Sequence, residues 1–89
     1  MEYTKEQSKF IYGLDFMKLG QAINHEQWQS AAMISRRMDM RAKEVGIIGF
    51  DRQFTGIRQC INRKDKLQAK QVLSIVINKR VQMMKQMKE

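Results

Sequence analysis

The 89-residue sequence contains no proline, one cysteine and one histidine. Without proline and with only five glycines, it lacks the residues that punctuate strands and tight turns, which excludes an all-β fold. A single cysteine, Cys60, cannot close an intramolecular disulfide, so we expect a buried, unreactive thiol and a reducing, cytoplasmic setting. No apolar run approaches the roughly 20 residues that span a bilayer. The N-terminus also lacks the basic-then-apolar order of a signal peptide, so we expect a soluble chain with no membrane partner.

The residues that most catalytic sites need are missing as well. The single histidine, His25, falls between two helical segments, where we expect a solvated turn residue. Gly46 and Gly49 flank two isoleucines rather than the lysine and hydroxyl of a phosphate-binding loop. The acidic residues are scattered singly, which gives neither a carboxylate pair nor a calcium loop. We therefore expect no enzyme activity, no cofactor and no metal site.

The residues that are present favour one helical domain over 1–89. Apolar residues make up 43% of the chain, enough to close a core. The net charge of +8 is unevenly distributed. Residues 1–35 hold three basic and four acidic residues, whereas residues 36–89 hold fourteen basic and five acidic ones. An excess of this kind attracts an acidic protein, a nucleic acid or an anionic surface, without saying which.

Cap signals and apolar periodicity predict four helices. Thr4 with Gln7, Asn24 with Gln27 and Asp65 with Gln68 each fit a helix start, and Gly46 is placed to end a helix in the left-handed conformation. The expected helices cover Lys5 to Ile23, Glu26 to Glu44, Phe50 to Asn62, and Lys66 to about Lys88. Their short connections predict an antiparallel up-down-up-down four-helix bundle. Gln21-Ala22-Ile23-Asn24 and Gln59-Cys60-Ile61-Asn62 end the first and third helices with similar residues, as two matching hairpins would.

Helical periodicity also predicts which side chains form the core. In the first helix two apolar stripes imply several packing neighbours; they comprise Phe10, Leu14 and Met17, and Tyr12, Phe16, Leu19 and Ile23. The second helix turns one apolar face inward, made of Trp28, Ala31, Ile34, Ser35, Met38, Ala42 and Val45. The third repeats Phe50, Phe54, Ile57 and Ile61. The last presents Ala69, Leu73, Val76, Ile77, Val81 and Met84, with Arg80 in the same arc, where we expect it to snorkel or pair at an edge.

Opposite the core face of the second helix, methionines and cations share one side. These residues are Met33, Arg36, Arg37, Met40 and Lys43. Exposed methionines beside cations are typical of an adaptable docking surface, although solvated helix faces also carry basic residues routinely. The set is the candidate partner-binding site.

From Gln21 onward the layout resembles the histidine-containing phosphotransfer (HPt) domain, a four-helix bundle that relays phosphoryl groups between receiver domains in bacterial two-component signalling. Val45-Gly46 stands for the family's Leu-Gly pair, and Arg63-Lys64-Asp65 stands for the turn before its last helix. Phe50, Phe54 and Ile57 stand for its spaced apolar positions, and the correspondence is ungapped from Ser35 to Ile61.

The resemblance fails at the residue that the phosphorelay needs. Counting back from Gly46 puts Arg36 where the phosphoaccepting histidine belongs, with Asp39 and Met40 in place of the family's lysine and glycine. An arginine guanidinium is not a nucleophile at physiological pH. The chain thus resembles a pseudo-HPt domain that docks a receiver-type or other acidic protein without phosphotransfer.

Two other functions remain open. One is a basic nucleic-acid-binding bundle whose phosphate contacts come from helices three and four, namely Arg52, Arg58, Arg63, Lys64, Lys66 and Lys70. The other is a structural homo-oligomer, such as a homodimer, in which the apolar stripes of the first helix or the methionine face would be the interface.

Overall fold

The computed structural model describes residues 2–87 of the chain, which form an all-α bundle without strands among those residues. The predicted all-α class is therefore confirmed. Five helices follow one another: α1 (Lys5–Ile11), α2 (Asp15–Asn24), α3 (Trp28–Glu44), α4 (Asp51–Asn62) and α5 (Lys66–Met87). The predicted end of the last helix at Lys88 lies outside the described residues.

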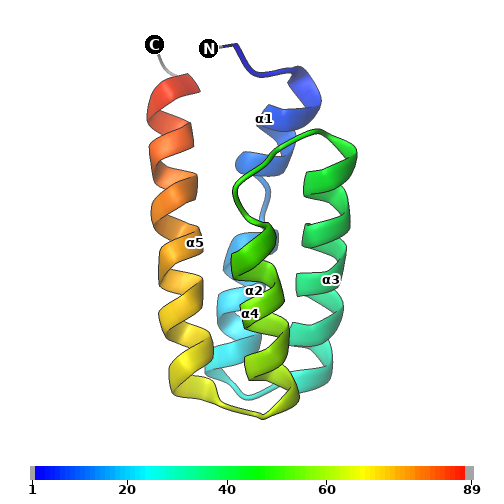
Figure 1. The fold of residues 1–89 in the computed structure, drawn as a ribbon, viewed down its shortest axis with the longest axis vertical. Coiled ribbons are helices and arrows are strands. Elements are labelled where there is room, and N and C mark those ends of the chain that lie inside the picture. The colour runs from blue at the N-terminus through cyan, green and yellow to red at the C-terminus, as the bar shows by residue number, and fades with distance from the viewer. Residues whose placement is uncertain (1, 88–89) are drawn as a thin grey trace.

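The helices pack as four rods around one core. Helix α2 packs against α3 and α5, α4 packs against the same two helices, and the short α1 contacts α3 and α5. Figure 1 shows the chain passing down the long axis through α1 and α2, up through α3, down α4 and up α5. The start of α1, the α3–α4 loop and the end of α5 consequently lie together at one end of a body of 38 × 21 × 20 Å.

The prediction of one continuous helix from Lys5 to Ile23 is wrong, because the chain breaks at residues 12–14. A side chain on Gly13 would lie only 3.1 Å from the Lys9 carbonyl oxygen, so this close turn favours glycine. The guanidinium of Arg80 on α5 satisfies the carbonyls that the break leaves without helical partners. Its Nε donates to the Ile11 oxygen at 2.6 Å and its Nη2 contacts the Gly13 oxygen at 3.5 Å. Arg80 also lies over the Phe16 ring, 4.7 Å from its centroid.

The break changes which side chains reach the core. Leu14, Met17 and Tyr12 were expected to pack, but 63%, 55% and 46% of their surfaces are exposed. A helical-wheel projection assumes one continuous helix. A projection drawn across the break at Gly13 therefore assigns these residues to the wrong face. On α5, Val81 is 42% exposed and is a second correction to the expected core.

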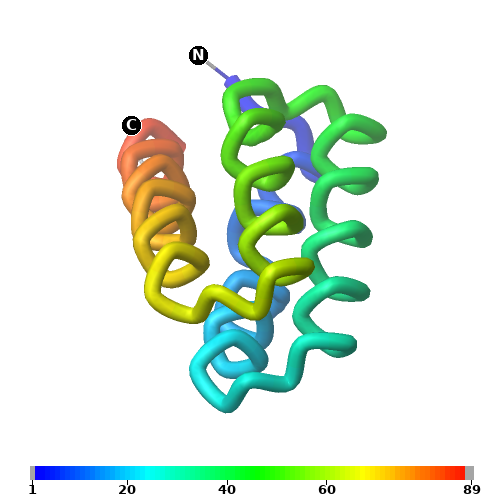
Figure 2. Tube along the Cα trace, turned by 60° about the horizontal axis from the view of Figure 1, so that its bottom comes forward, coloured from blue at the N-terminus to red at the C-terminus, as the bar shows by residue number. Residues whose placement is uncertain are grey.

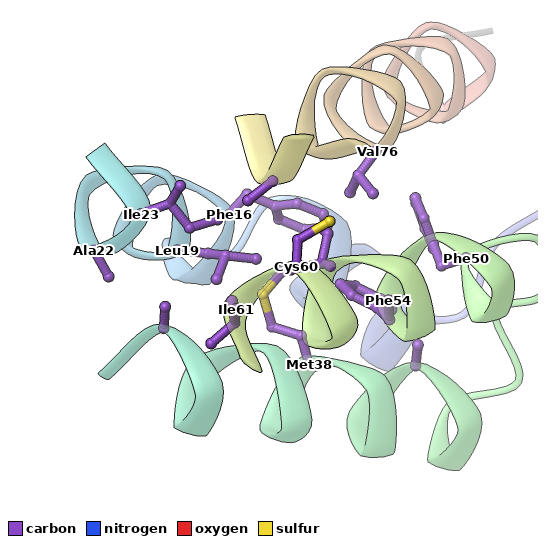
Figure 3. Close-up of a cluster of buried hydrophobic side chains, with 14 of the residues drawn as sticks. Phe16, Leu19, Ala22, Ile23, Met38, Phe50, Phe54, Cys60, Ile61 and Val76 are labelled. Atoms are coloured by element: carbon purple, nitrogen blue, oxygen red, sulfur yellow. The ribbon is translucent and has the colours of Figure 1, made fainter. Parts of the chain in front are cut away.

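The core itself contains the apolar faces that periodicity predicted. Phe16, Leu19, Met38, Phe54 and Val76, from four different helices, are at most 1% exposed and meet in the centre of the bundle (Figure 3). Phe10, Phe16, Phe50 and Phe54 form an aromatic cluster in which neighbouring ring centroids lie 5.5–6.3 Å apart. Such edge and tilted contacts add to the free energy gained by burial.

Two of the helix starts follow the predicted caps and one does not. Thr4 and Gln7 form a reciprocal capping box at α1, and the Asp65 carboxylate accepts from the Gln68 amide at 3.1 Å. By contrast, α3 begins after Gln27 without a side-chain cap, so the predicted Asn24 cap is wrong. Gly46 has a φ of +78° and ends α3 in the left-handed conformation, as predicted.

The connections α2–α3 and α4–α5 repeat one turn. In each, an amide donates back five residues, from Gln27 to the Ala22 oxygen and from Asp65 to the Cys60 oxygen. The residue before each donor, Glu26 or Lys64, is left-handed with a φ of 56° or 54°. Both turns lie at the same end of the bundle, where Figure 2 brings them forward. The similar residues that end the first and third predicted helices thus end α2 and α4 in the same geometry.

Candidate docking face on helix α3

The five residues predicted to bind a partner lie on the outer side of α3, and we call them the α3 strip: Met33, Arg36, Arg37, Met40 and Lys43. All five are exposed, with 70% of Met33 and 58% of Met40 open to solvent. Core residues Ala31, Ser35, Met38 and Ala42 hold the opposite side of the same helix in the bundle. Helical period therefore places the strip outward, as expected.

The cations of the α3 strip differ in their surroundings. Arg37 makes a two-point contact with the Asp15 carboxylate of α2, at 2.8 Å and 3.3 Å. Lys43 lies between two carboxylates, 3.3 Å from Asp51 and 3.6 Å from Asp39. The hydrogen bond to Asp51 and the negative charge of Asp39 raise the pKa of Lys43 above its ordinary value of 10.5. Only Arg36 in the strip has no carboxylate within salt-bridge distance among residues 2–87.

Arg36 also lies beside an open hollow of about 350 Å³. The hollow is lined by Ala32, Met33, Arg36, Arg37 and Met40. Two flexible thioether side chains around a shallow depression can adapt to an apolar side chain from outside. The free guanidinium beside them can accept a carboxylate through parallel hydrogen bonds.

Beneath the strip lies an ion pair that the sequence analysis missed. The Asp39 side chain is only 7% exposed and accepts a 2.6 Å hydrogen bond from Nη1 of Arg58 on α4. Asp39 and Lys43 are one helical turn apart, so the sequence alone could have indicated that these two side chains pair. The Arg58 partner lies 19 residues away and carried no local signal. Arg58 was a candidate phosphate contact, but its guanidinium is committed to Asp39.

Four of the five basic residues that remain from the candidate phosphate contacts lie around the α4–α5 turn, and the fifth lies at the other end of α4. Arg52 is at the start of α4, whereas Arg63 and Lys64 follow its end, so α4 separates them along the bundle (Figure 1). Lys66 begins α5, and Lys70 one turn later contacts the Asn24 side chain at 3.4 Å.

The two residues with reactive side chains lie where the sequence placed them. His25 is exposed and caps the end of α2. Cys60 is 4% exposed and packs inside the bundle (Figure 3). In residues 2–87 no three His, Cys, Asp or Glu side chains gather as metal ligands would. Of the helices formed by these residues, none has both the length and the apolar composition that crossing a membrane requires.

No protein-family model, curated protein or solved structure matches the chain, so the α3 strip has to be interpreted from its own chemistry.

Proposed function

We propose that this chain is a non-catalytic, HPt-like signalling module that docks an acidic partner, such as a response-regulator receiver domain, through the α3 strip in the cytoplasm. Its bundle would be the antiparallel up-down-up-down type of that family, and no phosphoryl group would be transferred. The observation that carries the proposal is the pair of exposed methionines, 70% and 58% open, on either side of the unpaired Arg36. Large apolar side chains around a cation are typical of interface centres.

The charge of the strip favours a different protein over a second copy of this chain. A two-fold axis through the middle of the strip would place Arg36 and Arg37 of one copy against the same residues of the other. Like charges brought together in an interface oppose association. A partner with a carboxylate and an apolar side chain satisfies both parts of the strip.

The ion pairs within the chain indicate how much the methionines and the cations of the α3 strip each contribute to the free energy of binding. Asp15, Asp39 and Asp51 already neutralise much of the charge on Arg37 and Lys43. The apolar contact of Met33 and Met40 should therefore contribute most of the affinity, while Arg36 and the net charge of +8 speed the encounter. The association rate should fall with added salt more than the dissociation rate changes.

The absence of phosphotransfer follows from the side chain at position 36. A phosphoaccepting group needs a lone pair that attacks phosphorus, and a guanidinium remains protonated at all relevant pH values. Arg36 can still bind a carboxylate or phosphate as an ion. We therefore expect docking to require no phosphoryl group on the partner, because Arg36 would not receive one.

The test is surface-immobilised capture of purified receiver domains with a matched pair of double variants. Arg36→Glu with Met40→Lys alters the α3 strip, whereas Arg52→Glu with Leu67→Lys makes the same change of charge and also replaces one exposed apolar residue, on α4 and α5. We expect the first variant to lose capture and the second to retain it. Equal capture by both variants contradicts the assignment of the strip, and retention of random DNA or RNA at moderate salt instead would favour the nucleic-acid alternative.

A further inference from the structure

A cavity of about 510 Å³ lies between the N-terminal segment, the α3–α4 loop and the last turns of α5. Figure 1 shows these three segments at one end of the bundle. Its volume is within the range of small-molecule pockets. We call it the end cavity. Within the described part of the chain, its lining combines amides and apolar side chains with one cation, Lys79, and one acid, Glu2: Glu2, Tyr3, Gln7, Gly46, Ile47, Ile48, Gly49, Lys79, Gln82, Met83 and Gln86.

Hydrogen bonds between distant segments hold the walls of the end cavity in place. Gln7 of α1 donates to the Val45 oxygen at 2.9 Å, and the Tyr3 hydroxyl donates to Gln86 Oε1 of α5 at 2.8 Å. Lys79 of α5 donates to the Gly49 oxygen and so fixes the α3–α4 loop. A pocket formed before its ligand arrives loses less conformational entropy on binding.

Of the residues that the structure describes, Lys79 is the one cation in the lining of the end cavity, and it forms no ion pair with Glu2, the one acid there. The Lys79 residue is partly buried, and its ammonium contacts only neutral oxygens, those of Gly49 and Gln53. No carboxylate lies within salt-bridge distance of it among residues 2–87. An ammonium carries three donor protons, so one remains for a ligand. A partly desolvated cation without a counter-ion favours an anion beside it.

Two side-chain amides and two apolar side chains of the lining indicate the remaining groups of the ligand. The Gln86 Nε2 group is free to donate while its oxygen accepts from Tyr3, and the Gln82 amide makes no hydrogen bond within residues 2–87. The buried Ile47 and the partly buried Met83 supply apolar walls. One cation and two neutral amide donors can hold a single carboxylate. A phosphate dianion would need more positive charge than the described lining supplies, which holds one cation and one acid, Lys79 and Glu2.

We propose that the end cavity binds a small monocarboxylate with an apolar tail, its carboxylate on Lys79 and the free amides and its tail along Ile47 and Met83. The site is separate from the α3 strip and does not rest on its function. Binding would tie the α3–α4 loop more firmly to α5, because the ligand contacts both.

The test is a titration of the ¹⁵N-labelled chain with octanoate, followed by backbone amide shifts. Octylamine has the same tail with the opposite charge, and acetate has the same head without the tail. We expect saturable shifts with octanoate alone, confined to residues around the cavity, while the indole of Trp28 at the far end of α3 stays unmoved. Lys79→Gln should weaken octanoate binding about tenfold, as loss of a charged hydrogen bond predicts. Lys85→Gln removes an equal charge from an exposed position outside the lining and should leave binding unchanged.

A second variant covers the case in which Lys79 is needed for folding. Gln82→Glu places a carboxylate one helical turn from Lys79 at an exposed position, where it should occupy the ammonium and weaken octanoate binding. The proposal is overturned by non-saturable shifts, by equal shifts with octylamine, or by equal loss of affinity in Lys79→Gln and Lys85→Gln. If Lys79→Gln unfolds, unchanged affinity in Gln82→Glu overturns it.

Discussion

Arg80 should be the most important polar side chain for the stability of the N-terminal half, because its guanidinium donates to backbone oxygens at the break between α1 and α2. We expect Arg80→Met, which keeps an apolar stem, to lose the 2.6 Å bond to the Ile11 oxygen and the contact over the Phe16 ring. A hydrogen bond from a charged donor contributes about 1.5–3 kcal/mol and a cation–π contact about 0.5–1 kcal/mol. Since the guanidinium is only partly buried, water replaces some of this, which leaves a loss of about 2 kcal/mol.

Urea unfolding monitored by circular dichroism measures this loss directly. A destabilisation of about 2 kcal/mol corresponds to a melting temperature lower by roughly 8–16 °C in a domain of this size. Arg80→Lys keeps the charge but has no planar fork, so it should recover about half of the loss. Lys85→Met, an exposed change on the same helix, should stay within about 0.5 kcal/mol of the parent. The reasoning is refuted if Arg80→Met unfolds at the same urea concentration as Lys85→Met.

Three further outcomes follow from the charges and turns. Arg58→Met should cost about 2 kcal/mol because it leaves the buried Asp39 carboxylate with only its longer contact to Lys43, and adding Asp39→Leu should restore most of it; additive losses in the double-mutant cycle would contradict this. Lys64→Gly should raise the free energy of unfolding by about 0.5 kcal/mol because glycine adopts the 54° φ without strain, whereas Lys64→Ala should show no gain in the same melts. The raised pKa of Lys43 stabilises the fold fully below pH 10.5 and less as pH rises through its higher native value. The stability difference between the parent and Lys43→Gln should therefore shrink in alkaline urea titrations, and a difference that stays constant there would rule out the linkage.

What could be predicted from the sequence was local. The Thr4–Gln7 capping box, the Asp65 cap and the left-handed Gly46 each depend on a few neighbouring residues, and all three occur. Periodicity also placed the α3 strip outward, because α3 is an uninterrupted helix over the whole segment.

What could not be predicted depends on residues far apart in the chain. The break near Gly13 is stabilised by a side chain 69 residues from Ile11, and no local pattern announces that contact. From the sequence alone Asp39 would be assigned to the surface. It is buried because the packing of α4 on α3 brings Arg58 beside it. The end cavity is similarly assembled from three separated segments, so its lysine and glutamines looked like ordinary residues of a solvated helix.

The α3–α4 loop also links two halves of the chain, α1 to α3 and α4 to α5, each of which contains one of the matching turns. Two left-handed glycines, Gly46 and Gly49, let this link fold back on itself. If it were shortened, the halves of one molecule could no longer reach each other, and two molecules would exchange them to form an intertwined dimer with the same core contacts. The length and bend of this loop therefore allow the two halves to pack on each other within one chain.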